Sequence, residues 1–280
     1  MMPNPAAFGD ARDAGQPRWF VPQSQSGRGA LSEPDAALLG FVAEMYAVQM
    51  DQLAVLLASP AEPTRSDAAA ARELVARWRA AGLVESEQLT LGEPWVWATR
   101  KGLDACGLRT KVTRPAARFL RHTHAVTDVR LAIQQAPAFG EGGGWWRAER
   151  SMLTELEFPG RPEHVPDGEV YWPASTGSPS AGQVLAVEVE ISRKSVVRTA
   201  AIMREVLARI GDYGTPATAS SQPRVALRYS SVVYVCSPAS VKNVLEARAE
   251  VGFPLAARIQ VFDLPESAMR LNTPKRGWQS

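Results

Sequence analysis

The sequence predicts an α/β protein of the α+β kind, in which a small helical unit precedes a mixed sheet flanked by helices. In the first part of the chain, apolar residues recur with helical spacing and are followed by two short alternating runs. The later part places strand-like runs and amphipathic helices in the order α-β-β-β-α-β-α-β, which requires right-handed crossover connections. A chain of 280 residues is long enough for two domains with cores of their own.

Composition and punctuation divide the chain into five segments. Residues 1–33 and 266–280 are expected to be tails, the first because it is rich in Gly, Pro, Ser and Gln. Residues 34–108 form the predicted helical domain, and 119–265 form the predicted sheet domain. Residues 109–118 form a basic connector between them.

Bulk composition excludes some classes of protein but favours none. The net charge is +2, and the two cysteines, Cys106 and Cys236, lack the spacing of a zinc site or disulfide framework. The N-terminus lacks the pattern of a signal peptide, and no apolar run approaches the roughly 20 residues of a membrane span. A cytoplasmic protein without membrane contact is expected.

Residues 34–108 show three helices, a hairpin and a short final helix. The third helix should end at Gly82, because glycine adopts the left-handed conformation that terminates helices. The predicted elements are a helix capped by Asp35, a helix over 50–57, a helix capped by Ser66 or Asp67, a hairpin within 88–99, and a helix from Arg100.

This order resembles a winged helix-turn-helix, with the hairpin as the wing. The resemblance implies that the third helix enters the DNA major groove. Residues 64–121 contain 11 Lys and Arg against 6 Asp and Glu, a basic excess that suits phosphate binding. A winged helix used for protein contacts is the alternative. The candidate DNA contacts are Arg65, Arg72, Arg77, Arg79, Arg100 and Lys101.

The second domain should open with a helix over about 119–135, on which Asp128 is expected to be exposed. His122 and His124 are two residues apart and do not share a helix face, so no metal site is expected from them. The pattern of residues 145–152 predicts the first strand of this domain. Further strands are predicted at 169–172, 184–191, 231–235 and 259–264, with helices after Lys194 and from Pro238.

The stretch from Val184 to Ser195 carries the strongest chemical signal. Along a strand, side chains alternate between faces, so Glu188 and Glu190 should lie side by side on an otherwise apolar strand. Two neighbouring carboxylates disfavour joint ionisation, and a divalent cation would remove that conflict. A solvated face of an edge strand is the alternative.

Pro166-Asp167, about twenty residues, Glu188-x-Glu190 and then Lys194 together resemble the PD-(D/E)XK nuclease superfamily. Glu190 stands where the family's lysine usually falls, and Lys194 could take over that role. The resemblance implies a restriction-endonuclease-like sheet in which Asp167, Glu188 and Glu190 hold Mg²⁺ or Mn²⁺. Lys194 would then orient or activate the attacking water and steady the developing charge.

The combination of a winged helix with HVPDGEVYW and VEVEISRKS is also similar to the actinobacterial replication-relaxation family of plasmids and integrative elements. The predicted function is a DNA-binding protein of a plasmid or mobile element with a magnesium-dependent endonuclease core and duplex DNA as its partner. A homodimer and other replication or transfer proteins stay open as partners. The alternatives are a non-catalytic replication or transcription regulator with a decayed core, and a transcription factor that responds to a small molecule.

Overall fold

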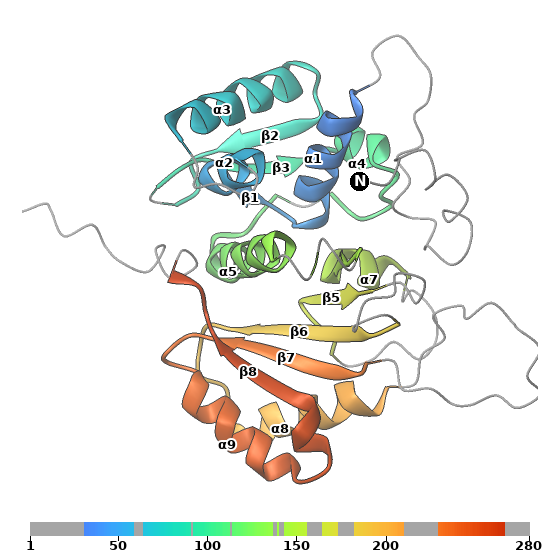
Figure 1. The fold of residues 1–280 in the computed structure, drawn as a ribbon. Coiled ribbons are helices and arrows are strands. Elements are labelled where there is room, and N and C mark those ends of the chain that lie inside the picture. The colour runs from blue at the N-terminus through green and yellow to red at the C-terminus, as the bar shows by residue number, and fades with distance from the viewer. Residues whose placement is uncertain are drawn as a thin grey trace, which may run out of the picture.

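The computed structural model describes residues 31–58, 64–90, 92–112, 114–136, 139, 143–155, 164–172, 182–209 and 229–266. Within these ranges the protein is mixed α+β with two separate sheets (Figure 1). Nearly all of the two predicted tails lies outside the described residues.

The N-terminal unit combines four helices with a small antiparallel sheet of order β1-β3-β2. The third helix packs against the second and against β2, and β2 forms one edge of the sheet. The elements are α1 (Glu33–Glu44), β1 (Val48–Gln49), α2 (Met50–Ala58), α3 (Arg65–Ala80), β2 (Val84–Glu87), β3 (Trp95–Ala98) and α4 (Arg100–Ala105).

The caps of two helices differ from the prediction. Helix α1 begins at Glu33 with Ser32 as its N-cap, because the Ser32 hydroxyl accepts the Asp35 N–H. Helix α3 is capped by Thr64, and Asp67 returns a hydrogen bond to the Thr64 N–H in a capping box. In both cases the aspartate expected at the cap is instead the third residue of the helix, three positions after the N-cap.

The predicted hairpin is correct in kind but wrong in its first strand. That strand is Val84–Glu87, which pairs with Trp95–Ala98, whereas 88–90 contain no strand. Alternation alone could not choose between the two runs. The choice follows from Gly82, whose φ of 71° turns the chain straight from α3 into β2. The two-residue strand β1 was not predicted.

The second sheet is mixed and has the order β4-β5-β6-β7-β8. Its first three strands are antiparallel neighbours, and β6, β7 and β8 run parallel. Parallel neighbours need crossover connections, which α8 and α9 supply. The strands are β4 (Trp145–Ala148), β5 (Gly168–Tyr171), β6 (Val184–Glu190), β7 (Ser231–Cys236) and β8 (Ile259–Asp263).

The predicted strand over 145–152 is wrong in its second half. Strand β4 ends at Ala148, and Glu149 opens a short helix, α7 (Glu149–Glu155). Arg147, Glu149 and Ser151 therefore do not share one strand face. The helix turns the chain away at the end of the sheet and leaves Glu149 at that end.

Helices cover both faces of this sheet. Helix α5 (Ala117–Gln135) lies between the N-terminal unit and the sheet, and α8 (Val196–Ala208) and α9 (Val241–Val251) lie on the other side (Figure 1). The alternation predicted for β6 is confirmed: Val187 and Val189 belong to the core on the α5 side, and Ala186 belongs to the core under α8 and α9. A 3₁₀ helix, η5 (Leu255–Arg258), leads into β8.

One hydrophobic core runs from the N-terminal unit through α5 to the sheet. Buried polar contacts cross the same junction. Arg130 pairs with Glu44 at 2.8 Å and lies 4.2 Å from the centroid of the Phe41 ring. Asp128, expected to be exposed, is buried, and its carboxylate accepts a 2.5 Å hydrogen bond from Gln52 on α2. Asp128 therefore faces the N-terminal unit rather than the end of the sheet.

Candidate functional site

Strand β6 extends beyond β5, and the candidate site forms where β5 stops. Strand β5 pairs only with residues 184–187 of β6, so the stretch from Glu188 to Glu190 has β7 alone as its neighbour. The pairings of β4 with β5 and of β5 with β6 end at Ala148, Gly168 and Val187. One residue further along the same registers, Glu149, Asp167 and Glu188 lie side by side. The backbone follows this alignment, since the Glu149 N–H donates to the Asp167 carbonyl at 3.2 Å.

Asp167 closes the open edge of β6 with its side chain. Its Oδ2 accepts the Val189 N–H at 2.7 Å, and its Oδ1 lies 2.8 Å from Nε2 of His122 on α5. Burial alone would raise the pKa of this carboxyl, but the nearby His122 outweighs burial and lowers it. Asp167 is therefore an ionised carboxylate at neutral pH.

Glu188 is buried and has a histidine as its partner. His164 Nε2 lies 2.7 Å from Glu188 Oε1. Burial raises the pKa of Glu188 to about 7, although the hydrogen bond from His164 opposes that rise. Burial also lowers the pKa of His164, but Glu188 reverses this and gives a net increase. The two side chains therefore favour a shared proton, because each stabilises the charged form of the other.

Glu190 bonds to the lysine that the sequence singled out. Lys194 Nζ donates a short hydrogen bond to Glu190 Oε1, from the loop between β6 and α8. Burial raises the pKa of Glu190, and Lys194 partly offsets the increase. The Lys194 charge also acts on Asp167 and Glu188, so its ammonium lies within electrostatic reach of all three predicted acids.

Glu149 is a fourth carboxylate that sequence reasoning missed. Burial raises its pKa to about 7, and the charges of Asp167 and Glu188 add to the increase. Among the described residues, its carboxylate has no hydrogen-bonding side chain. A neutral carboxyl or a bound cation would satisfy this position. The signal was hidden because 145–152 resembled a continuous strand.

The two histidines were also not predicted as members of the site. His122 was judged only as a partner for His124, yet it faces Asp167 while His124 is buried beside Asp128. Burial lowers the pKa of His122, but Asp167 outweighs this and raises it to about 9. His164 lies three residues before Asp167, a spacing that indicated nothing by itself. Arg147 on β4 pairs with Glu169 at 3.0 Å.

An open cleft of about 530 Å³ leads to the row of carboxylates. His122, Glu149 and Asp167 lie in its wall. The lining also includes Tyr46 from the N-terminal unit, and Arg118 and Phe119 from the first turn of α5. The cleft therefore joins the site to the junction between the two halves of the protein.

The carboxylate oxygens of this site are the kind of ligand that a hard divalent cation prefers. Four carboxylates gather around one end of the sheet, and the pKa values of Glu149 and Glu188 are raised to about 7. The described ranges contain no group of three Asp, Glu, His or Cys side chains already arranged to hold a metal ion. His122, His164 and Lys194 occupy oxygens of three carboxylates. Metal binding would require the carboxylate side chains to rearrange.

The six candidate DNA contacts lie on the N-terminal unit, and most have a protein partner. On α3, Arg72 lies 3.4 Å from Glu93 and Arg77 lies 3.5 Å from Asp35, both at the surface. Arg100 donates to the Thr110 carbonyl and Lys101 to the Ala81 carbonyl. Arg65 and Arg79 are exposed. Exposed ion pairs contribute little to stability, so Arg72 and Arg77 are readily available for other contacts.

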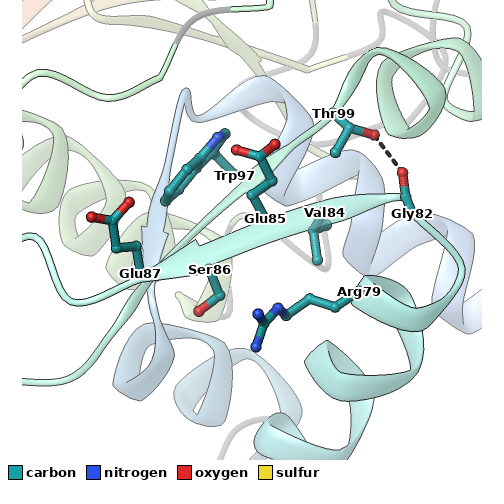
Figure 2. A pocket seen from close by; sticks show the side chains of 8 residues that line it. All are labelled: Arg79, Gly82, Val84, Glu85, Ser86, Glu87, Trp97 and Thr99. Atoms are coloured by element: carbon teal, nitrogen blue, oxygen red, sulfur yellow. Dashed lines mark hydrogen bonds between the residues drawn. The ribbon is translucent and has the colours of Figure 1, made fainter.

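A second hollow, of about 430 Å³, follows β2 between the end of α3 and the hairpin. Figure 2 shows Arg79 reaching from α3 towards Ser86 on one side of the strand, with Glu85 and Glu87 on the other. Thr99 Oγ1 donates to the Gly82 carbonyl at 2.7 Å and holds the base of the hairpin to the end of α3. The two glutamates make this side of the hairpin unsuitable for phosphate.

No protein-family model, curated protein or solved structure matches this chain. In the parts of the chain that the structure describes, no helix has the length and apolar character needed to cross a membrane.

Proposed function

We propose that this protein binds DNA and hydrolyses phosphodiester bonds at the site formed by Glu149, Asp167, Glu188 and Glu190 with Lys194. The observation that carries the proposal is the alignment of Glu149, Asp167 and Glu188 across β4, β5 and β6, beside a lysine that reaches Glu190. Acids brought together from separate parts of the sequence, with pKa values shifted from their usual range, are typical of functional sites.

Glu149, Asp167, Glu188 and Glu190 would hold Mg²⁺ or Mn²⁺, which when bound polarises the phosphate and activates water. Lys194 supplies a positive charge close to the acids and favours the additional negative charge of the transition state. His122, with a pKa of about 9, carries a proton at neutral pH that it could donate to the leaving oxygen.

The N-terminal unit would deliver the DNA. The order of its helices and its three-stranded sheet support the winged-helix interpretation, and α3 presents four arginines as the groove-reading element. A setting in the DNA metabolism of plasmids or integrative elements follows from the resemblance to the replication-relaxation family.

A second candidate function rests on the bases in the site. His122, His164 and Lys194 each neutralise one carboxylate without any metal. Such a network would also stabilise a non-catalytic regulator that binds DNA through the N-terminal unit. In that protein the acids and bases hold the end of the sheet together and no bond is cleaved.

Conversion of supercoiled plasmid to nicked or linear DNA separates the two functions. The full chain is incubated with Mg²⁺ or Mn²⁺, and Glu188→Gln is compared with Glu246→Gln, which alters an exposed surface pair on α9. The nuclease should lose cleavage in Glu188→Gln and keep it in Glu246→Gln. Absence of cleavage by the wild type with either metal would support the regulator.

A further inference from the structure

The cleft in front of the carboxylates contains an aromatic side chain that the proposed chemistry does not use. Phe119 lies in the first turn of α5, lines the cleft and is 56% exposed. The Arg118 guanidinium lies 4.6 Å from the centroid of its ring. An exposed aromatic ring beside an arginine is the arrangement on which unpaired nucleic-acid bases stack.

The position of Phe119 relates it directly to the site. Phe119 and His122 are three residues apart on one helix, so their side chains are neighbours on the same face. His122 in turn bonds to Asp167. If a base stacks on Phe119, the sugar-phosphate backbone of that nucleotide would therefore lie about one helical turn from the carboxylates.

A second aromatic side chain, Tyr46, also lines the cleft and is held in place. Tyr46 lines the cleft with a φ of 59°, a conformation that is costly for a tyrosine. Arg150 lies 5.0 Å from the centroid of the Tyr46 ring and donates to the carbonyls of Ala43 and Lys111, both at 2.7 Å. Retaining such a backbone at a cleft is typical of a binding surface.

Charge at the rim indicates the class of ligand. Arg114 and Arg118 line the cleft and belong to the stretch 105–127, which contains five Lys and Arg and no Asp or Glu. Arg114 lines the cleft with its guanidinium bonded to Glu87, and Arg118 lines it without an ion pair among the described residues. Arginines beside an exposed aromatic ring match a polyanion whose bases are unstacked, which is single-stranded nucleic acid.

We propose that this cleft binds single-stranded DNA, with an unpaired base stacked on Phe119 next to the carboxylate row. The inference rests on the proposed function in naming DNA as the ligand, and it makes unpaired DNA the substrate class. A duplex held by α3 would reach this cleft with one strand locally separated or with a single-stranded extension.

Binding without cleavage tests the proposal. Fluorescence anisotropy would compare a labelled 20-nucleotide oligo-dT with a 20-base-pair duplex, using the full chain in EDTA. Phe119→Ala should weaken oligo-dT binding about tenfold, as expected for the loss of one stacking aromatic, and should change duplex binding less than twofold. Phe119→Trp should retain the affinity for oligo-dT. Phe253→Ala is the control, because Phe253 is 90% exposed on the turn after α9.

The proposal is overturned if the wild type does not bind oligo-dT, or if Phe119→Ala leaves oligo-dT binding unchanged or weakens both ligands equally. These outcomes differ from failure of the nuclease. Selective loss of oligo-dT binding, in a protein that cleaves nothing with Mg²⁺ or Mn²⁺, would support the cleft and refute the hydrolytic site. If the protein cleaves DNA and Phe119→Ala changes the binding of neither ligand, the hydrolytic site is supported and the cleft proposal is refuted.

Discussion

His122 Nε2 lies 2.8 Å from Asp167 Oδ1 and joins the middle layer of the protein to the end of its sheet. His122 belongs to α5, which contacts the N-terminal unit, and Asp167 immediately precedes β5. The same aspartate accepts the Val189 N–H from β6. One carboxylate therefore connects three elements, and the effect of this connection on stability should depend on pH.

Replacing His122 with Gln should remove a pH-dependent part of the stability. The His122 pKa is raised from 6.5 to about 9, so the pair stabilises the fold fully below pH 6.5 and loses this effect as the pH rises through about 9. At pH 6 the loss in unfolding free energy should be about 1 kcal/mol. This value already allows for solvent screening, because the imidazole is 40% exposed. Urea denaturation at pH 6 and pH 9.5 measures it.

Arg121→Gln is the matched control, as Arg121 is an exposed neighbour on the same helix. It should shift stability by less than about 0.5 kcal/mol at either pH. A His122→Gln difference that is the same at pH 6 and pH 9.5 would contradict the electrostatic origin of the effect.

Replacing Lys194 with Met should abolish cleavage while leaving the protein folded. The substitution keeps most of the apolar stem and removes the ammonium that bonds to Glu190. Loss of one preorganised charge from a transition state typically costs about 10²–10³ in rate. Plasmid cleavage rates with Mg²⁺ measure the effect, and Arg193→Met, which changes an exposed neighbour, is the control. Undiminished cleavage by Lys194→Met would remove this lysine from the mechanism.

Replacing Arg72 and Arg77 with Ala should weaken duplex binding and its dependence on salt. Their surface pairs with Glu93 and Asp35 are long and exposed, so little stability is lost. Each arginine that contacts a phosphate should contribute about one unit to the slope of log affinity against log salt. Titrations of a labelled duplex at salt concentrations from roughly 50 to 200 mM measure the slope, because affinities that depend on phosphate contacts change strongly over this range. Arg198→Ala, exposed on α8 on the far side of the sheet, should leave it unchanged.

Replacing Gly168 with Ala should destabilise the protein by about 1–3 kcal/mol through overpacking. A Cβ atom at this position would lie 2.0 Å from the Trp146 ring on the neighbouring strand. Gly40→Ala on α1 is the control, because a Cβ there meets no atom within 4 Å and alanine is the better helix former. The melting temperature should fall for the first variant and stay level or rise for the second, and an unchanged value for Gly168→Ala would show that the sheet tolerates a shift of Trp146.

The sequence by itself determined the order of the strands and of the long helices in the second half, the alternation along β6, and the candidates Asp167, Glu188, Glu190 and Lys194. These features are local, because they depend on side-chain period, turn residues and spacing. Its errors were local ambiguities too. Two neighbouring runs competed for one strand of the hairpin, and Glu149 continued the pattern of β4 although the chain turns there.

Only the tertiary structure decided which bases face the acids and which residues are buried. His122 and Asp167 are 45 residues apart, and Asp128 and Gln52 are 76 apart. No local period relates such positions. Their contacts depend on how α5 lies between the sheet and the N-terminal unit (Figure 1). On that helix His122 bonds to Asp167, and Asp128 bonds instead to Gln52 of the N-terminal unit.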